Sequence, residues 1–417
     1  MIKGFSSLFG FVLGEKLPHT FSPKIHSLLA DYSYGIKELT RNELEGFMKS
    51  YNFDFLNVTI PYKKEIMKFL SSLSDEAKKI GAVNTVKRMA DGTLCGFNTD
   101  YYGFDYTLKK SGISVSGAKV IVLGSGGASM PVKAVLRDRG AREIVTISRS
   151  GENNYKNIST HYDADIVVNT TPVGMFPNNG EKLLELDKFK RCKGVIDIIY
   201  NPQKTALLID AEALGIKHCG GLSMLVAQAK RAAEIFTDCN IDDSEIERIE
   251  SIISYDMTNI ILVGMPSSGK TTVGKIIANK TSKPFFDSDD EFEKIFTMTP
   301  AEAIEKLGVS EFRKMEHSVI KELGKKSGCV ISTGGGVVTR KENYAPLHQN
   351  GTIFFINRDL EKLSVDNRPI SKAVGIEKLY EERLPLYLDF CDKSIYNNDT
   401  VESAANEIIE LAKAGIR

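Results

Sequence analysis

Two glycine-rich loops constrain the fold of this chain more than any other feature, because each lies between a strand-like run and a helix-like run. The first is GSGGAS at residues 124–129, and the second is GMPSSGKT at residues 264–271. A glycine turn that leads from a strand into a helix is typical of nucleotide sites, since backbone N–H groups and the helix N-terminus face the phosphate. The sequence therefore predicts two nucleotide-binding units, one in each half of the chain.

Short apolar runs rich in β-branched residues recur between helix-length amphipathic segments along the chain. Examples are KVIVL (119–123), EIVTIS (143–148), DIVVN (165–169), GVIDIIY (194–200), IILVG (260–264), CVIST (329–333) and TIFFIN (352–357). This alternation predicts an α/β fold with parallel sheets. The helix-like run 227–236 is followed by a polar segment, 237–259, with one short helical piece. We therefore expect a domain boundary near residue 256.

Charge, cysteine content and hydropathy limit the classes of function. The chain has 417 residues, with 54 Lys+Arg and 54 Asp+Glu, so nothing favours nucleic acid or an anionic membrane as a partner. The six cysteines form no C-x-x-C pair, which favours reduced thiols in a cytoplasmic protein. No apolar run approaches the ~20 residues of a membrane-spanning helix. The N-terminal segment 1–18 lacks a sustained apolar core and predicts a first strand with its loop rather than a signal peptide.

The second loop fits the pattern G-x-x-x-x-G-K-S/T, with the strand-like NIILV before it and the helix-like TVGKIIANKT after it. In such a loop the Lys270 ammonium lies between the β- and γ-phosphates and the Thr271 hydroxyl is a ligand of Mg²⁺. Asp287 and Asp289 follow two residues apart, on one side of an extended segment. They can serve Mg²⁺ and an acceptor hydroxyl, although a solvated acidic loop is the alternative interpretation. These features predict a site for ATP and Mg²⁺.

From residue 257 to 417 these segments form a pattern that resembles shikimate kinase. The motifs, in the family's order, are the P-loop, the D-x-D pair, GVSEFRKME with Arg313, TGGG (333–336), RPI with Arg368 and EERLPLY with Arg383. The resemblance covers nearly the whole half. One departure is the lid stretch SVDNRPISKAVG, which carries a single arginine where the family often has more.

The resemblance to shikimate kinase implies a role for each matched residue. Asp287 supports Mg²⁺ through water, and Asp289 holds the reacting hydroxyl and is placed to take its proton. The implied shikimate-binding residues are Asp289, Arg313, Gly334, Gly335, Gly336 and Arg383. The implied ATP-binding residues are Pro266, Ser267, Ser268, Gly269, Lys270, Thr271, Thr272 and the lid residue Arg368.

The first loop lies in KVIVLGSGGASMPVKAVLRDRGAREIVTIS, which predicts strand, glycine loop, helix and strand. Ser129 stands where the dinucleotide fingerprint has its third glycine. The second strand ends in SRSGEN, with Arg149 at the tip where an NAD enzyme would place Asp or Glu. A cation there favours the 2′-phosphate of NADP, the alternative being a plain surface charge. Upstream, Lys63 and Asp100 are a plausible proton-transfer pair, although position alone does not distinguish Lys63 from a solvated lysine.

Residues 1 to about 245 resemble shikimate dehydrogenase. The matching motifs are HTFSP (19–23), NVTIPYK (57–63), GAVNT (81–85), NTD (98–100), GSGGAS (124–129), NTTPVGM (169–175), IYNP (199–202) and GLSMLVAQA (221–229). The resemblance implies that Lys63 and Asp100 are the catalytic pair. The implied substrate-binding residues are Thr20, Ser22, Thr59, Lys63, Asn84, Asp100, Tyr200 and Gln228. The implied NADP-binding residues are Gly124, Gly126, Gly127, Ala128, Arg149, Gly221 and Met224.

Three departures bear on specificity in this half. Thr20 stands where the family usually has Ser, and its extra methyl keeps quinate open as a side substrate. Ser148 stands where Asn is common before the NADP arginine, and Met130-Pro131 is unusual at a helix start. The preference for NADP over NAD therefore follows from Arg149 alone.

Together the two resemblances imply a bifunctional enzyme of the shikimate pathway in which NADPH reduces 3-dehydroshikimate and ATP then phosphorylates shikimate. The expected division is a substrate-binding domain at 1–103 completed by 222–245, an NADP-binding Rossmann domain at 104–221, a linker at 246–258 and a P-loop kinase domain at 259–417. The expected partners are small-molecule substrates, with a homodimer as one option for the assembly. Two alternatives stay open: a quinate/shikimate dehydrogenase fused to the same kinase, and a regulatory protein with inactive sites.

Overall fold

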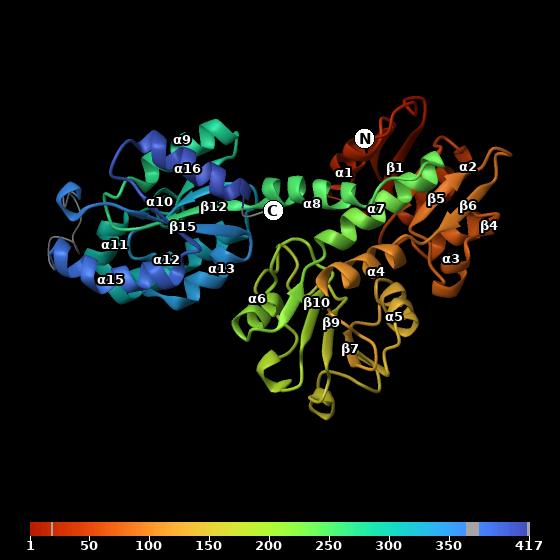
Figure 1. Ribbon diagram of the computed structural model, residues 1–417, viewed down its shortest axis with the longest axis horizontal. Helices are drawn as coiled ribbons and strands as arrows, with labels where there is room; N and C mark the ends of the chain where they lie inside the picture. The colour runs from red at the N-terminus through yellow and green to blue at the C-terminus, as the bar shows by residue number, and fades with distance from the viewer. Residues whose placement is uncertain (18–19, 364–374, 415–417) are drawn as a thin grey trace. The chain divides into compact units, whose positions relative to one another are not determined.

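The computed structural model describes residues 1–17, 20–363 and 375–414 (Figure 1). The chain forms two compact units. The first comprises Met1–Val173, Lys182–Tyr200 and Asp210–Ile253, and the second comprises Gly174–Glu181, Asn201–Ile209 and Ser254–Arg417. The α/β class expected from the alternating pattern is confirmed in both units.

The first sheet of unit 1 is mixed rather than parallel. Its order is β2 (Ser33–Glu38), β1 (Phe9–Gly14), β3 (Phe55–Val58), β5 (Thr85–Arg88), β6 (Leu94–Phe97) and β4 (Ser72–Leu73). Strand β5 runs antiparallel to both β3 and β6. The expectation of parallel sheets is wrong here because Asp91-Gly92 closes a tight hairpin, with Gly92 at φ +83°. An Asp-Gly pair between strands is a strong hairpin signal.

The helices of this part are α1 (Ser22–Leu29), α2 (Arg41–Ser50), η1 (Glu65–Phe69) and α3 (Asp75–Ile80). The predicted first strand is confirmed as β1. Its Leu13 packs with Leu56, Val58 and Val86 in a core whose members are all almost fully buried. This core fixes the loop after β3, which carries Thr59 and Lys63.

The second sheet of unit 1 is entirely parallel. Its order is β11 (Lys217–Cys219), β10 (Gly194–Asp197), β9 (Ile166–Asn169), β7 (Lys119–Leu123) and β8 (Glu143–Ile147). The other elements of this part are α4 (Asp100–Ser111), α5 (Ser129–Asp138), η2 (Ile158–His161), η3 (Leu186–Lys188) and α7 (Leu222–Thr237). Helix α6 (Ala206–Ala213) begins in unit 2 and ends in unit 1. All five residues of β7 are buried, which explains its unbroken apolar run. Ligands in such sheets bind beyond the carboxyl ends of the strands, so the loop after β7 is well placed for a nucleotide.

Helices α4 and α7 approach each other closely at Gly103. A Cβ atom on Gly103 would lie 2.7 Å from the carbonyl oxygen of Met224 and 3.1 Å from the Cβ of Gln228. Only glycine permits this contact, because real Cβ atoms do not approach backbone so closely. The packing therefore brings Asp100, at the start of α4, into the same region as Gln228 on α7.

The polar segment after α7 contains a helix, α8 (Ser244–Met257), of 14 residues. Its Ile246, Ile249, Ile253 and Met257 are buried and recur every three or four positions, which is the period of one helix face. The one helical piece expected within 237–259 is thus α8, and it covers all of the expected linker 246–258 except its last residue. The boundary between the two units falls within α8, between Ile253 and Ser254.

The sheet of unit 2 is parallel throughout. Its order is β13 (Phe285–Asp287), β14 (Val330–Ser332), β12 (Asn259–Val263), β15 (Gly351–Asn357) and β16 (Lys393–Tyr396). Its helices are α9 (Lys270–Thr281), α10 (Ser288–Phe296), α11 (Pro300–Leu307), α12 (Val309–Lys325), η4 (Val337–Thr339), η5 (Lys341–Asn343), α13 (Tyr344–His348), η6 (Leu360–Lys362), α15 (Ile376–Phe390) and α16 (Val401–Ala414).

Both faces of this sheet are covered by helices. Figure 1 shows α9 and α16 on one side of β12 and α12 and α13 on the other. Accordingly Ile260 and Leu262 pack with the α9–α16 core, whereas Ile261 and Val263 pack with the α12 core. Successive side chains on a strand face opposite sides, so the apolar run Ile260–Val263 of β12 serves two cores at once.

Candidate active sites

The predicted catalytic pair of unit 1 forms a close ion pair. The Lys63 Nζ lies 2.6 Å from Asp100 Oδ2, and the side chains are 19% and 7% exposed. Lys63 comes from the loop after β3, and Asp100 is the first residue of α4. Partial burial strengthens the interaction between the charges, yet the lysine keeps some access for a ligand. This arrangement can hold an ammonium group beside a reacting oxygen.

Four other predicted substrate residues of unit 1 are Thr20, Ser22, Thr59 and Asn84. The Thr20 hydroxyl donates to Ser22 Oγ at 3.1 Å. Asn84 is 5% exposed and comes just before β5. Thr59 follows β3, and its backbone N–H donates to Leu13 O. Each of these side chains ends in a hydroxyl or an amide, which is the chemistry that recognises carboxylate and hydroxyl groups.

Gln228 and Tyr200 complete the predicted substrate set. The Gln228 Oε1 atom is buried and has no hydrogen-bond partner among the residues that the structure describes. A buried polar atom without a partner is costly, so a ligand hydroxyl donating to Gln228 would remove that cost. The Tyr200 ring packs edge-on against Phe21 at 6.2 Å, and burial raises the pKa of its hydroxyl.

The loop after β7 has the form of a phosphate cradle. Gly124 adopts φ +100°, and Cβ atoms on Gly126 or Gly127 would meet no atom within 4 Å. That open side leaves room for a ligand to approach the backbone. Ser129 is fully buried, and its hydroxyl donates to Gly126 O at 2.7 Å. Ser129, which stands in place of the third fingerprint glycine, therefore stabilises the loop at the start of α5 through this hydrogen bond.

The remaining predicted NADP residues lie in three places. Ala128 is the residue before α5, and Arg149 is exposed just beyond β8 without an ion pair to any described residue. Gly221 has a structural reason to be glycine, since a Cβ there would lie 2.0 Å from Ile198 O. Met224, on α7, is 7% exposed. Arg149 is thus the group best placed to meet an anion from solvent.

The P-loop of unit 2 runs from β12 into α9. Gly264, Ser267 and Gly269 have φ of +152°, +65° and +96°, a backbone that turns sharply between strand and helix. The Lys270 ammonium donates to Gly264 O at 3.0 Å and Met265 O at 2.8 Å. The rest of the predicted ATP segment, Pro266, Ser268 and Thr272, lies on the same turn and the first residues of α9.

The predicted metal ligands lie next to each other. The Thr271 hydroxyl donates to Asp287 Oδ2 at 2.8 Å. Mg²⁺ in nucleotide sites is usually held by one or two protein oxygens together with phosphates and water. A hydroxyl and a carboxylate in contact at the P-loop therefore fit that ion.

Asp287 and Asp289 do not share one side of an extended segment, so that part of the reasoning was wrong. Asp287 ends β13 and caps α10, where its carboxylate accepts from the Asp289 N–H at 3.1 Å. Asp289 lies in the first turn of α10. The cap rather than strand alternation sets their geometry, because Asp at an N-cap accepts from backbone N–H groups of the first turn.

The glycine run after β14 allows close approach to charged side chains. A Cβ on Gly336 would lie 1.8 Å from Arg313 Nη2, and one on Gly334 would lie 3.0 Å from Asp289 Oδ1. The Arg383 Nη1 donates to Gly335 O at 2.9 Å. The structure thus brings together the described residues of unit 2 that are predicted to bind shikimate. Arg368 lies outside the described residues.

Two residues of this cluster were missed by sequence reasoning. Glu316 is 4% exposed, and its Oε2 accepts from Arg313 Nη1 at 2.7 Å. Burial raises the pKa of Glu316, while Arg313 opposes that shift. The Tyr387 hydroxyl donates to Gly335 O. The i, i+3 spacing of Arg313 and Glu316 in RKME could have predicted this ion pair, because residues three apart on a helix are neighbours.

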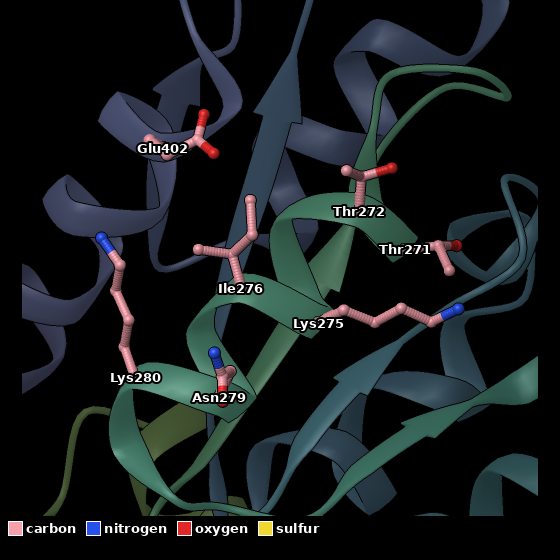
Figure 2. Close-up of a pocket in the computed structure, with 7 residues that line it drawn as sticks. All are labelled: Thr271, Thr272, Lys275, Ile276, Asn279, Lys280 and Glu402. Atoms are coloured by element: carbon pink, nitrogen blue, oxygen red, sulfur yellow. The ribbon is translucent and has the colours of Figure 1, made fainter.

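A groove of about 460 Å³ opens beside the P-loop (Figure 2). Glu402 comes from α16, and the other lining residues, Thr271, Thr272, Lys275, Ile276, Asn279 and Lys280, come from α9. Figure 2 shows Thr272, Ile276 and Glu402 around the same space. Its volume lies in the range of small-molecule sites.

Comparison with known proteins decides the family of unit 1. Residues 12–86 match the family model for the shikimate dehydrogenase substrate binding domain. A shikimate dehydrogenase (NADP(+)) of Clostridium beijerinckii is 38% identical over 265 residues, which cover 59% of this chain and 97% of that protein. The chain belongs to the shikimate dehydrogenase family. Residues 266–413 match the family model for shikimate kinase, so the chain also carries a shikimate kinase domain in its C-terminal part.

Solved structures agree with the assignment to the shikimate dehydrogenase family. Shikimate 5-dehydrogenase of Thermus thermophilus in complex with NADP(H) and shikimate has a TM-score of 0.54 at 31% identity, covering 58% of this chain and 98% of that one. Quinate dehydrogenase of Corynebacterium glutamicum in complex with NAD has a TM-score of 0.54 at 25% identity, covering 59% and 98%. No helix in the described part of this chain is long and apolar enough to cross a membrane.

Proposed function

We propose that this chain reduces 3-dehydroshikimate to shikimate with NADPH and then phosphorylates shikimate to shikimate 3-phosphate with ATP and Mg²⁺. The Lys63–Asp100 ion pair carries the first activity, and the Thr271–Asp287 contact at the P-loop carries the second. We assign substrate binding to residues 1–103 and 222–245, NADP binding to 104–221 and the kinase to 259–417, with 246–258 between them.

In the dehydrogenase reaction, bound NADPH supplies the hydride to the carbonyl carbon. The Lys63 ammonium gives a proton to the carbonyl oxygen as that oxygen gains charge, and the Asp100 carboxylate holds the ammonium in place. The hydroxyls of Thr20 and Ser22 bind the substrate carboxylate. Gln228 accepts from a ring hydroxyl, which satisfies its buried oxygen.

In the kinase reaction, bound ATP supplies the phosphoryl group. Lys270 stabilises charge on the phosphates, and Thr271 with Asp287 holds Mg²⁺. Asp289 orients the acceptor hydroxyl, and the guanidinium groups of Arg313 and Arg383 bind the carboxylate of shikimate. The groove beside Thr272 gives room to the rest of the nucleotide.

Two turnover assays on the purified chain test the proposal. We expect NADPH oxidation that depends on 3-dehydroshikimate, and ADP release that depends on shikimate and Mg²⁺. Absence of either activity in a folded chain would refute that half of the proposal. The same result would favour a regulatory protein with inactive sites.

Quinate oxidation is the second candidate for the dehydrogenase part. Thr20 is the observation that favours it, because its methyl group alters the pocket beside the substrate carboxylate. The similarity to a quinate dehydrogenase at 25% identity also supports it. Initial rates on quinate and shikimate, each with NADP⁺ and with NAD⁺, separate the two activities. A higher kcat/KM for quinate than for shikimate would identify quinate as the main substrate.

Arg149→Asp should raise the KM for NADP⁺ by about 10-fold or more and leave that for NAD⁺ similar or lower. The change replaces a partner of the 2′-phosphate with a carboxylate that repels it and accepts from a ribose hydroxyl. Steady-state kinetics with both cofactors measure the effect. Lys190→Asp, which makes the same charge change at another exposed site of unit 1, is the control. An unchanged KM for NADP⁺ would mean that another residue binds the phosphate.

Gly336→Ala should raise the kinase KM for shikimate by about 10-fold, since an interaction with a charged partner is worth roughly that factor. The new Cβ would lie 1.8 Å from Arg313 Nη2, so the guanidinium must move. The kinase KM for ATP of the same variant, which requires a folded unit 2, serves as the folding control. A normal KM for shikimate would show that Arg313 does not bind it from this position.

A further inference from the structure

A series of hydrogen bonds, called here the hydrogen-bond chain, links Tyr34 to Asn84 in unit 1. The Tyr34 hydroxyl, on β2, donates to Asn57 Oδ1 at 2.7 Å. Asn57 Nδ2 donates to Thr85 Oγ1 at 3.2 Å, and Thr85 Oγ1 donates to Asn84 Oδ1 at 3.0 Å. Each link has a donor on one side and an acceptor on the other, so the chain has one direction. It ends at Asn84, a residue that is predicted to bind the substrate.

The Thr99 backbone N–H fixes how Asn84 presents its amide, and the bond from Thr85 supports the same orientation. Its Oδ1 accepts from Thr85 and also from the Thr99 N–H at 2.7 Å. Its Nδ2 donates to Thr99 Oγ1 at 3.1 Å. A carboxamide has two N–H donors, and among the residues that the structure describes Asn84 Nδ2 donates to Thr99 alone. Asn84 therefore offers an N–H, not a carbonyl oxygen, to a ligand hydroxyl.

His26 packs against Tyr34, the first residue of this series of hydrogen bonds. Its ring is 1% exposed and stacks on the Tyr34 ring, with centroids 4.0 Å apart. Burial lowers the pKa of His26 to about 3, so the ring is neutral and has one donor and one acceptor. The Tyr32 hydroxyl lies 2.6 Å from Nδ1.

Tyr34 also connects this chain to the hydroxyls proposed for the substrate carboxylate. Burial raises the pKa of the Tyr34 hydroxyl, and the Ser22 side chain opposes that shift; the Ser22 Oγ accepts from Thr20 at 3.1 Å. The phenolic oxygen thus interacts with both Ser22 and Asn57. Removing it would take one partner from each of these side chains.

We propose that Tyr34 is a positioning residue of the dehydrogenase, which holds Ser22 toward the substrate carboxylate and, through Asn57 and Thr85, holds the Asn84 amide with its N–H toward a ring hydroxyl. This inference rests on the proposed dehydrogenase function. Tyr34 itself does not touch the reacting atoms. We expect loss of the Tyr34 hydroxyl to weaken the binding of shikimate but not the binding of NADP⁺.

Tyr34→Phe tests the proposal by removing one oxygen while keeping the ring that stacks on His26. We expect the KM for shikimate to rise about 10-fold, with the KM for NADP⁺ unchanged within about 2-fold. Tyr162→Phe is the matched control, because Tyr162 packs edge-on against Phe189 at 5.1 Å outside this hydrogen-bond chain. The KM for NADP⁺ of each variant, which requires a folded unit 1, reports on folding.

A second variant and a double-mutant cycle separate positioning from a general loss of structure. Thr85→Val interrupts the chain in the middle with a side chain of the same shape, and it should raise the KM for shikimate in the same way. In an Asn84→Ala background, the effect of either variant should shrink several-fold, because coupled residues are not additive. Full additivity, or normal KM values in both variants, would overturn the proposal. A wild-type chain without dehydrogenase activity would instead refute the proposed function.

Discussion

Replacing Lys63 by Ala is expected to lower the dehydrogenase rate by about 10²–10⁴-fold, the usual contribution of a general acid or base. The reason is the 2.6 Å ion pair with Asp100, which places an ammonium where the carbonyl oxygen gains charge. Most of the loss should appear in kcat, because the proton is transferred only as the transition state forms. Shikimate-dependent NADP⁺ reduction, followed by NADPH absorbance, measures it.

Lys64→Ala is the matched control for this prediction. Lys64 is the next residue of the same loop, and it is exposed. It should leave both activities unchanged. Lys63→Ala should also leave the kinase rate unchanged, because the reacting groups of the kinase lie in unit 2. A near-normal dehydrogenase rate in Lys63→Ala would refute the assignment of the catalytic pair.

Replacing Lys270 by Ala should have the opposite selectivity. We expect ADP release to fall by about 10²–10³-fold, the usual cost of removing one preorganised group that stabilises transition-state charge. Lys270 is 7% exposed, and its ammonium is held by two P-loop carbonyls, so the charge is positioned before a phosphate arrives. A coupled assay for ADP at saturating shikimate measures the effect.

Lys321→Ala is the control for the kinase, because Lys321 is an exposed lysine of α12. It should change neither rate. The dehydrogenase rate of Lys270→Ala should match that of the wild type. Loss of both activities in Lys270→Ala would show that the two halves are not independent.

Local sequence patterns determined the strands and phosphate loops of this chain. The run KVIVL is strand β7 at the predicted residues, and TIFFIN lies within β15. Such strands are buried on both faces, so hydrophobicity and β-branching alone identify them. The two glycine loops were recognisable for a similar reason, because a sharp turn between strand and helix needs glycine at particular positions.

The tertiary structure alone decided how distant segments combine. Sequence did not place Tyr34 beside Asn57 or assign a direction to the hydrogen bonds that reach Asn84, since these residues come from separate strands. Nor did it show that the Gln228 oxygen is buried without a partner among the described residues, or that Gly336 lies against Arg313. Secondary structure follows mainly from neighbours along the chain, whereas donor direction, burial and close approach depend on which elements pack together.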